Sequence, residues 1–174
     1  MISKITLLFL LFPIVFFGQN TMTIKGGKVY PATSNWNFIC PNYALSGELT
    51  VQVAKTENGG LLKLSSLSSN PEFIIKGTVY IYLTNGAILT CTDKGNFENA
   101  GNQITSFFTF TTAEMQLLKK QDIQSIRYNI VGKSNVFSSQ IGNFTAINKQ
   151  NYYTTTYKSD SSTTYPTSNE IAAL

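Results

Sequence analysis

Two carboxylates, Asp93 and Glu98, are the best candidates for catalytic chemistry in this chain, and both lie in DKGNFENAGN, residues 93–102. Paired carboxylates can hydrolyse a glycosidic bond when roughly 5 to 10 Å separates them. The segment also offers the oxygen ligands that calcium takes, although its spacing matches no known calcium loop. Asp, Asn and Gly are equally ordinary in a long hairpin connection. The sequence therefore predicts no metal site, and Asp93 and Glu98 are the candidate ligands if one exists.

The chain contains no histidine. This absence excludes Ser-His-Asp and Cys-His catalysis, zinc held by imidazole, and an imidazole general base. Carboxylates, tyrosine, lysine and a bare thiol are what remain for chemistry. No motif indicates a cofactor, so we expect none and favour a protein without enzymatic activity.

Cys40 and Cys91 are the only cysteines. An exported protein meets an oxidising compartment, where a bridge between them would close a loop of about 50 residues and contribute roughly 4 kcal/mol in the chain-entropy model. The alternatives are two buried thiols or an intermolecular link. The sequence predicts the Cys40–Cys91 disulfide, and no nearby base favours a catalytic thiol.

Aromatic residues and the single arginine are the candidate binding residues. Tyr80 and Tyr82 alternate along one predicted strand and so share a face, which is either a binding strip or a row covered by a loop or a second sheet. Trp36 belongs to the same aromatic set, and Arg127 is either an anion anchor or a solvated surface residue. We predict Tyr80, Tyr82, Trp36 and Arg127 as the binding residues.

The N-terminus has the order of a secretory signal peptide. Lys4 precedes a run from Ile5 to Phe17 that is apolar except for Thr6, which is too short to span a bilayer and is followed by Gly18. An uncleaved anchor or a buried helix is the alternative. Cleavage after Gly18 would make residues 1–18 the signal peptide, and the protein secreted or periplasmic.

The charge pattern limits the partners. Loss of Lys4 would lower the net charge from +4 to +3, and the remaining charge is spread thinly, with Lys119-Lys120 the only adjacent basic pair. A nucleic-acid surface would cluster its basic residues. We therefore predict no nucleic acid partner, and membrane contact only through the signal peptide before cleavage.

Alternation of apolar and polar residues dominates from Glu48 onwards and predicts strands. Residues 48–65 read as a hairpin. Residues 76–92 read as a second hairpin, with Asn85-Gly86 in a type I′ turn. We expect a loop at residues 93–103, further strands near 104–110, 123–131 and 136–147, and one or two before residue 41. This pattern is typical of an antiparallel β-sandwich or flattened barrel of seven to nine strands.

One short helix is predicted over about residues 112–121, where Thr111 and Glu114 fit a capping box. Such a helix requires packing against the sheet. The surrounding pattern F-T-x-T-x-x-E-x-x-x-L-K-x-x-x-I-x-x-I-R, in Thr109–Tyr128, resembles one in small secreted proteins of unknown function, where a strand, a short helix and a strand follow one another. The resemblance implies no activity.

These observations predict a signal peptide at 1–18, a single β-rich domain at 19–148, and a flexible Thr/Ser/Tyr-rich tail at 149–174. The function they favour is non-enzymatic binding of a protein or glycan partner in the cell envelope or outside the cell. A small carboxylate-dependent hydrolase using Asp93 or Glu98 is the alternative.

Overall fold

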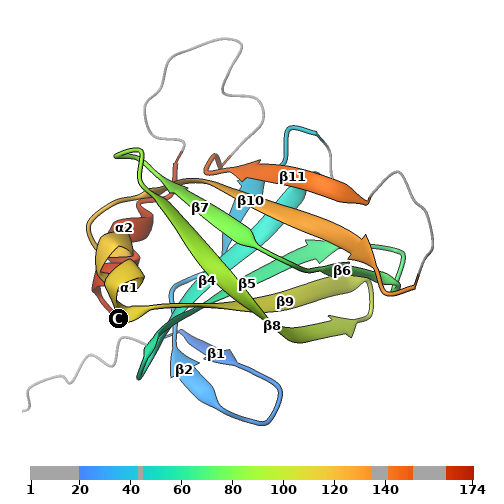
Figure 1. Cartoon of the computed structure of the whole chain (residues 1–174), viewed down its shortest axis with the longest axis horizontal. Helices are drawn as coiled ribbons and strands as arrows, with labels where there is room; N and C mark the ends of the chain where they lie inside the picture. The colour runs from blue at the N-terminus through green and yellow to red at the C-terminus, as the bar shows by residue number, and fades with distance from the viewer. Residues whose placement is uncertain (1–19, 43–44, 135–140, 151–163) are drawn as a thin grey trace, which may run out of the picture.

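Segments in which apolar and polar side chains alternate form strands, as the sequence pattern predicts, and the strands from residue 36 onwards meet in one sheet (Figure 1). The computed structural model describes residues 20–42, 45–134, 141–150 and 164–174. The predicted signal peptide lies outside these residues. No helix in the described part of the chain is long and apolar enough to cross a membrane.

The described residues form mainly β-structure with two short helices. In chain order the elements are β1 (Thr21–Thr23), β2 (Val29–Pro31), β3 (Trp36–Ile39), β4 (Glu48–Thr56), β5 (Gly59–Leu67), β6 (Phe73–Ile75), β7 (Val79–Leu83), β8 (Ile88–Ala100), β9 (Gln103–Phe110), α1 (Thr112–Leu118), β10 (Ile123–Gly132), β11 (Gly142–Ile147) and α2 (Thr167–Ala172).

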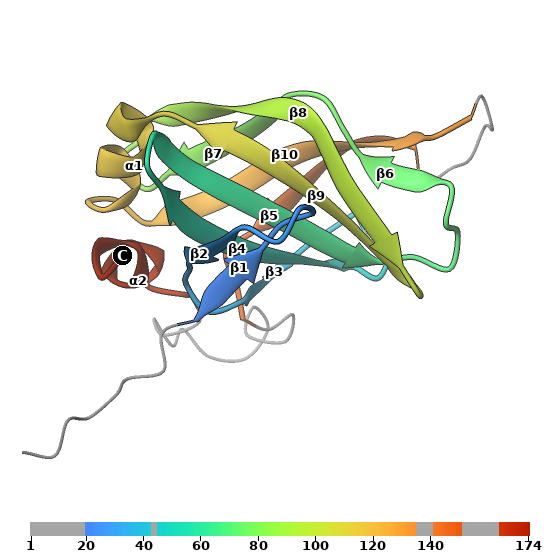
Figure 2. The same cartoon turned by 90° about the horizontal axis from the view of Figure 1, so that it is seen from below.

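The main sheet closes into an eight-stranded antiparallel barrel. Its strands follow the order β11-β3-β4-β5-β9-β8-β7-β10, and the pairing of β10 with β11 joins the two ends of that order. The short strand β6 pairs with β10 beyond the end of β7. The hairpin β1–β2 forms a separate two-stranded sheet that crosses the outside of the barrel (Figure 2). The predicted mainly β, antiparallel fold is confirmed, and the sheet is a closed barrel.

Large side chains fill the barrel interior. Trp36, Phe38, Phe108 and Tyr128 are all buried in the main core cluster. Trp36 is 0% exposed, so its predicted place in a binding strip is wrong. It faces inward because it alternates with the outward Asn37 on β3. A second, smaller core lies between the β1–β2 hairpin and the outer face of the barrel.

Both predicted hairpins form, but the second has a different turn. β4 pairs with β5, and β7 pairs with β8. A type I′ turn requires a positive φ at both of its central residues. Gly86 has a φ of +84°, but Asn85 does not have a positive φ, because Leu45 is the only non-glycine residue with one in the described part of the chain. The amide of Gly86 donates to the carbonyl of Leu83 (3.0 Å), which gives a longer loop with glycine in the left-handed position.

The loop predicted at residues 93–103 is mostly strand. β8 continues to Ala100 and pairs with β9, with a bulge between Asp93 and Asn96. Gly95, within the bulge, has a φ of +72°. A polar, glycine-containing segment can remain extended here because the apolar alternation of β9 supplies its partner, and such tertiary context overrides propensity.

The predicted capping box of α1 is confirmed. The Thr111 hydroxyl accepts from the backbone amide of Glu114 (3.3 Å), and the Glu114 carboxylate accepts from the Thr111 amide (2.7 Å). The helix ends at Leu118, earlier than the predicted residue 121. Met115 and Leu118 are buried against the barrel, which supplies the packing that so short a helix needs.

The C-terminal end of the predicted tail is structured. Residues 164–174 contain α2, whose Thr167 and Ile171 are fully buried, and Ile171 belongs to the main core. A flexible tail throughout residues 149–174 is therefore wrong for this part, and residues 151–163 lie outside the described ones. α1 and α2 lie together at one end of the barrel (Figures 1 and 2).

Glu170 connects α2 to the start of β3. Its carboxylate accepts from the indole Nε1 of Trp36 (3.0 Å) and from both the backbone amide (2.9 Å) and the hydroxyl (2.7 Å) of Ser34. Burial raises the pKa of this carboxyl, but the hydrogen bonds from Trp36 and Ser34 outweigh burial and lower the pKa below its ordinary value. The ionised form of Glu170 is therefore the one that stabilises the fold.

This arrangement predicts an acid-sensitive contribution to stability. Because the folded pKa of Glu170 is depressed, its contribution is present above the ordinary value of 4.5 and is lost as the pH falls through the folded pKa. The free energy of unfolding can be measured by urea titrations followed by the fluorescence of the single tryptophan. As the pH falls through that range, this free energy should decrease more steeply for the wild type than for Glu170→Gln. Glu57→Gln, at an exposed site, is the control. Identical pH profiles for the wild type and Glu170→Gln would contradict the assignment.

Candidate functional site

Three of the four predicted binding residues meet on the outer face of the barrel. β7 and β10 pair so that Tyr80 lies opposite Arg127 and Tyr82 lies opposite Ser125. On the next strand, β11, Asn143 lies opposite Asn129 of β10. The side chains of Val79, Ile81 and Leu83 are buried on the inner face, which leaves the tyrosines on the outer one. No second sheet covers this row in the described structure, since Tyr80 is 37% exposed.

These residues line a shallow hollow of about 410 Å³, called here the tyrosine–arginine hollow. Its lining is Thr78, Tyr80, Tyr82, Ile88, Arg127, Asn129 and Asn143. It lies over β7, the start of β8, β10 and β11, strands that are neighbours in the barrel (Figure 1). Aromatic rings and planar polar groups thus converge on one surface depression.

The polar groups of the hollow are available to a ligand. Within the described part of the chain, the Arg127 guanidinium, the two tyrosine hydroxyls and the side-chain amides of Asn129 and Asn143 have no hydrogen-bond or ion-pair partner. A guanidinium and two amides present several donors in fixed planes. Tyrosine adds rigid area with a polar tip at a small cost in conformational entropy. The hollow can therefore stack a ring and hydrogen-bond its substituents.

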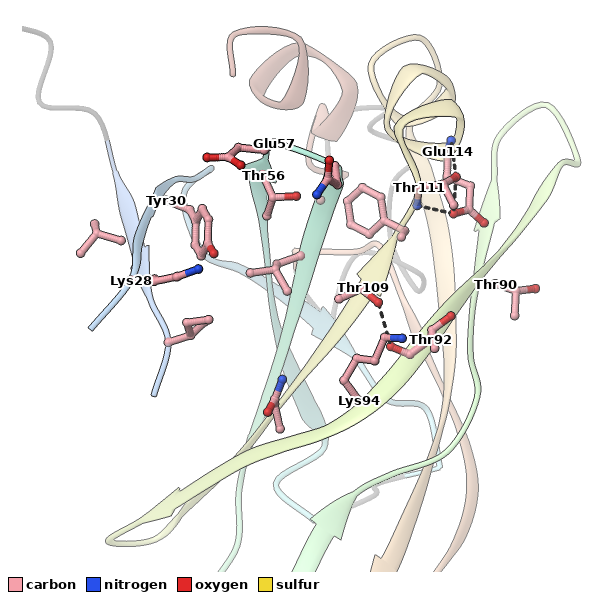
Figure 3. A pocket seen from close by; sticks show the side chains of 17 residues that line it. Lys28, Tyr30, Thr56, Glu57, Thr90, Thr92, Lys94, Thr109, Thr111 and Glu114 are labelled. Atoms are coloured by element: carbon pink, nitrogen blue, oxygen red, sulfur yellow. Dashed lines mark hydrogen bonds between the residues drawn. The ribbon is translucent and has the colours of Figure 1, made fainter. Parts of the chain in front are cut away.

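A larger groove, called here the hairpin groove, lies between the β1–β2 hairpin and the barrel (Figure 3). Its volume is about 840 Å³. Lys28 and Tyr30 come from the hairpin, and Thr90, Thr92 and Lys94 come from β8 on the far side (Figure 3). Sequence analysis missed this groove because the hairpin that forms one wall is anchored by contacts distant in sequence.

The predicted carboxylate pair does not form. Asp93 lies opposite Phe108, which faces the barrel interior, whereas Glu98 lies opposite Thr105, on the face shared with Phe107 of the outer core. The two carboxylates therefore project from opposite faces of the sheet. Asp93 also has a structural role, because its oxygens accept from the backbone amides of Gly77 (2.7 Å) and Gly95 (2.6 Å).

The same placement separates the two candidate metal ligands. Asp93 holds the backbone at the bulge, and Glu98 lines a different hollow beside Lys25. Among the described residues, no group of three or more cysteines, aspartates or glutamates could hold a metal ion.

The structure does not contain the predicted disulfide. Cys40 directly follows β3 and Cys91 lies in β8, and in the barrel order three strands separate β3 from β8 in either direction. Both thiols are buried, and Sγ of Cys40 lies 3.1 Å from the Tyr128 hydroxyl. Burial raises the pKa of Cys40 and, with the charge of Glu114, raises the pKa of Cys91 to about 12.

Asn129 and Asn143 are binding candidates that sequence reasoning missed. Asn129 follows Arg127 by two residues and so shares its strand face, a signal that alternation could have supplied. Asn143 reaches the hollow only through the pairing of β11 with β10. No local pattern reveals that pairing.

Comparison with known proteins gives no relative: no family model, no curated protein and no solved structure matches the chain. The chemistry of the hollow and the groove therefore carries the functional argument.

Buried thiols with raised pKa values should be unreactive in the folded protein. We expect a thiol reagent such as DTNB to label neither cysteine at neutral pH without denaturant, and to label both after unfolding in guanidinium without a reductant. A mass lower by two hydrogen atoms than that of the reduced protein would instead establish a disulfide.

Proposed function

We propose that this protein is an exported, non-enzymatic binding protein whose tyrosine–arginine hollow takes a protein or glycan partner. The single observation that carries the proposal is the convergence of two tyrosines, the only arginine and two asparagines, all with available polar groups, on one exposed face. Tyrosine and arginine are the residues enriched at the energetic centres of binding surfaces.

The composition of the hollow supports binding rather than catalysis. Arg127 is its only charged lining residue, so the hollow has no carboxylate or thiol to act as a nucleophile or a base. The hydrolase alternative used Asp93 or Glu98. Their projection from opposite sheet faces weighs against a carboxylate pair, and the two backbone amides that donate to Asp93 favour a structural role for that carboxylate.

Export is the second part of the proposal and depends on residues 1–18. The basic start, the short apolar run and the small residue Gly18 support a cleaved signal peptide, which would release the protein into the periplasm or the medium. The deep burial of Cys40 and Cys91 is compatible with an oxidising compartment, because it shields both thiols from oxidants.

Substitutions in the hollow should reduce binding without unfolding the protein. Tyr80→Ala and Arg127→Ala should each lower affinity about tenfold or more, since truncating an interface anchor commonly costs more than 1 kcal/mol. Binding would be measured on a glycan array and by pull-down from envelope extracts, followed by titration of the captured partner. Leu67→Ala is the control, because Leu67 is 60% exposed and lines neither the hollow nor the groove.

Retained affinity in both hollow variants would contradict the proposal, provided that their thermal unfolding matches the wild type. An equal loss of affinity for the partner in Leu67→Ala would also contradict the proposal, because the loss would then not be specific to the hollow.

Export predicts a defined N-terminus. Expression of the full chain with its own leader should give a mature form that begins at Gln19, which N-terminal sequencing and intact mass can identify. A Lys4→Glu variant should slow processing because it removes the basic start. Detection of Met1 in the folded protein of the culture fluid or periplasm would contradict cleavage.

A further inference from the structure

We infer that the tyrosine–arginine hollow and the hairpin groove are two parts of one extended site that binds a linear, largely neutral glycan. This inference rests on the proposed function and specifies its ligand. It also assigns a binding role to the hairpin groove.

The two depressions adjoin along the outer face. Thr90 lines the groove and lies directly opposite Tyr80, which lines the hollow. On β8, Thr92 follows two residues after Thr90 on the same face and lies opposite Thr109 of β9, another groove residue. A continuous row of outward side chains therefore connects the two depressions.

The connected surface suits a chain of several rings. Three inter-strand steps separate Thr109 on β9 from Arg127 on β10. At a spacing of about 4.8 Å between neighbouring strands, these steps span about 14 Å. Beyond Arg127, the same row continues to Thr145 on β11. A single small molecule would occupy only part of this length.

The chemistry of the groove favours a polyhydroxylated ligand. Its lining includes five threonines and two asparagines, together with Tyr30 from the hairpin. Within the described structure, the hydroxyls of Thr90, Thr92 and Tyr30 have no hydrogen-bond partner. Hydroxyls both donate and accept, as sugar hydroxyls do, so the two sets can pair in either direction. In the hollow, the tyrosine rings can stack on the apolar faces of sugar rings.

The charges favour a neutral chain over an acidic one. Lys28 and Lys94 in the groove are balanced by Glu57 and Glu114, and the hollow adds only Arg127. A strongly anionic glycan would meet the two carboxylates along with the cations.

Length dependence tests the inference. The probes are linear oligosaccharides of glucose, N-acetylglucosamine, mannose and xylose, each from the disaccharide to the hexasaccharide. In the series that binds, the hexasaccharide should bind the wild type at least tenfold more tightly than the disaccharide. Raising the salt concentration should change its affinity less than twofold, as a neutral ligand requires.

A matched pair of double variants separates the groove from the hollow. Thr90→Val/Thr92→Val removes two hydroxyls at nearly constant shape and should weaken the hexasaccharide about tenfold while leaving the disaccharide unchanged. Thr21→Val/Thr23→Val makes the same change at two exposed sites on β1 that line neither depression, and should have no effect.

The outcomes distinguish this inference from the proposed function. Equal affinity for short and long oligosaccharides would overturn the extended site, as would an unchanged hexasaccharide affinity in Thr90→Val/Thr92→Val. Loss of binding in Arg127→Ala would still support the hollow as the binding site. Binding of no oligosaccharide in any series would overturn the glycan assignment, and a protein partner that depends on Tyr80 would then remain as the function.

Discussion

Closure of the sheet by the pairing of β10 with β11 is the constraint on which the rest of the structure depends. In a closed ring, every strand residue faces either the interior or the outside, because side chains alternate along a strand. The interior is filled by large side chains, among them Trp36, Phe108 and Tyr128. The space that could carry a ligand then lies outside, where the tyrosine–arginine hollow and the hairpin groove are found.

The helical end of the barrel is held by polar contacts to the C-terminal segment. Asp122 accepts from the amide and hydroxyl of Ser168 at the start of α2, and Asn148 exchanges hydrogen bonds with the backbone of Tyr165. Together with Glu170, these groups fix a helix of six residues that would be unstable alone. None of these contact residues lines the hollow or the groove, so we expect substitutions in either depression to leave the contacts of α2 intact.

Local sequence patterns predicted the features of the fold that depend on residues close together in the chain. The alternation in β4, β5 and β7 and the capping box at Thr111 were readable, as was the shared face of Tyr80 and Tyr82. The long β8, helix α2 and the placement of Asn143 were not. Each of these depends on a pairing or packing contact that its own polar or glycine-containing composition does not reveal: β9 for β8, the main core for α2, and β10 for Asn143. The inward orientation of Trp36 was also misjudged, because an amphipathic aromatic suits either face.

We propose that this closed barrel binds its ligand on its outer face while its interior stays packed. Methyl-resolved NMR, titrated with the tightest oligosaccharide from the array, tests it most directly. Binding on the outer face should shift the outward methyl groups of Thr78, Ile88 and Thr90 and leave the inward methyl groups of Val79, Ile81 and Leu89 nearly unchanged. Shifts concentrated in those inward methyl groups would place the ligand inside the barrel and contradict binding on the outer face.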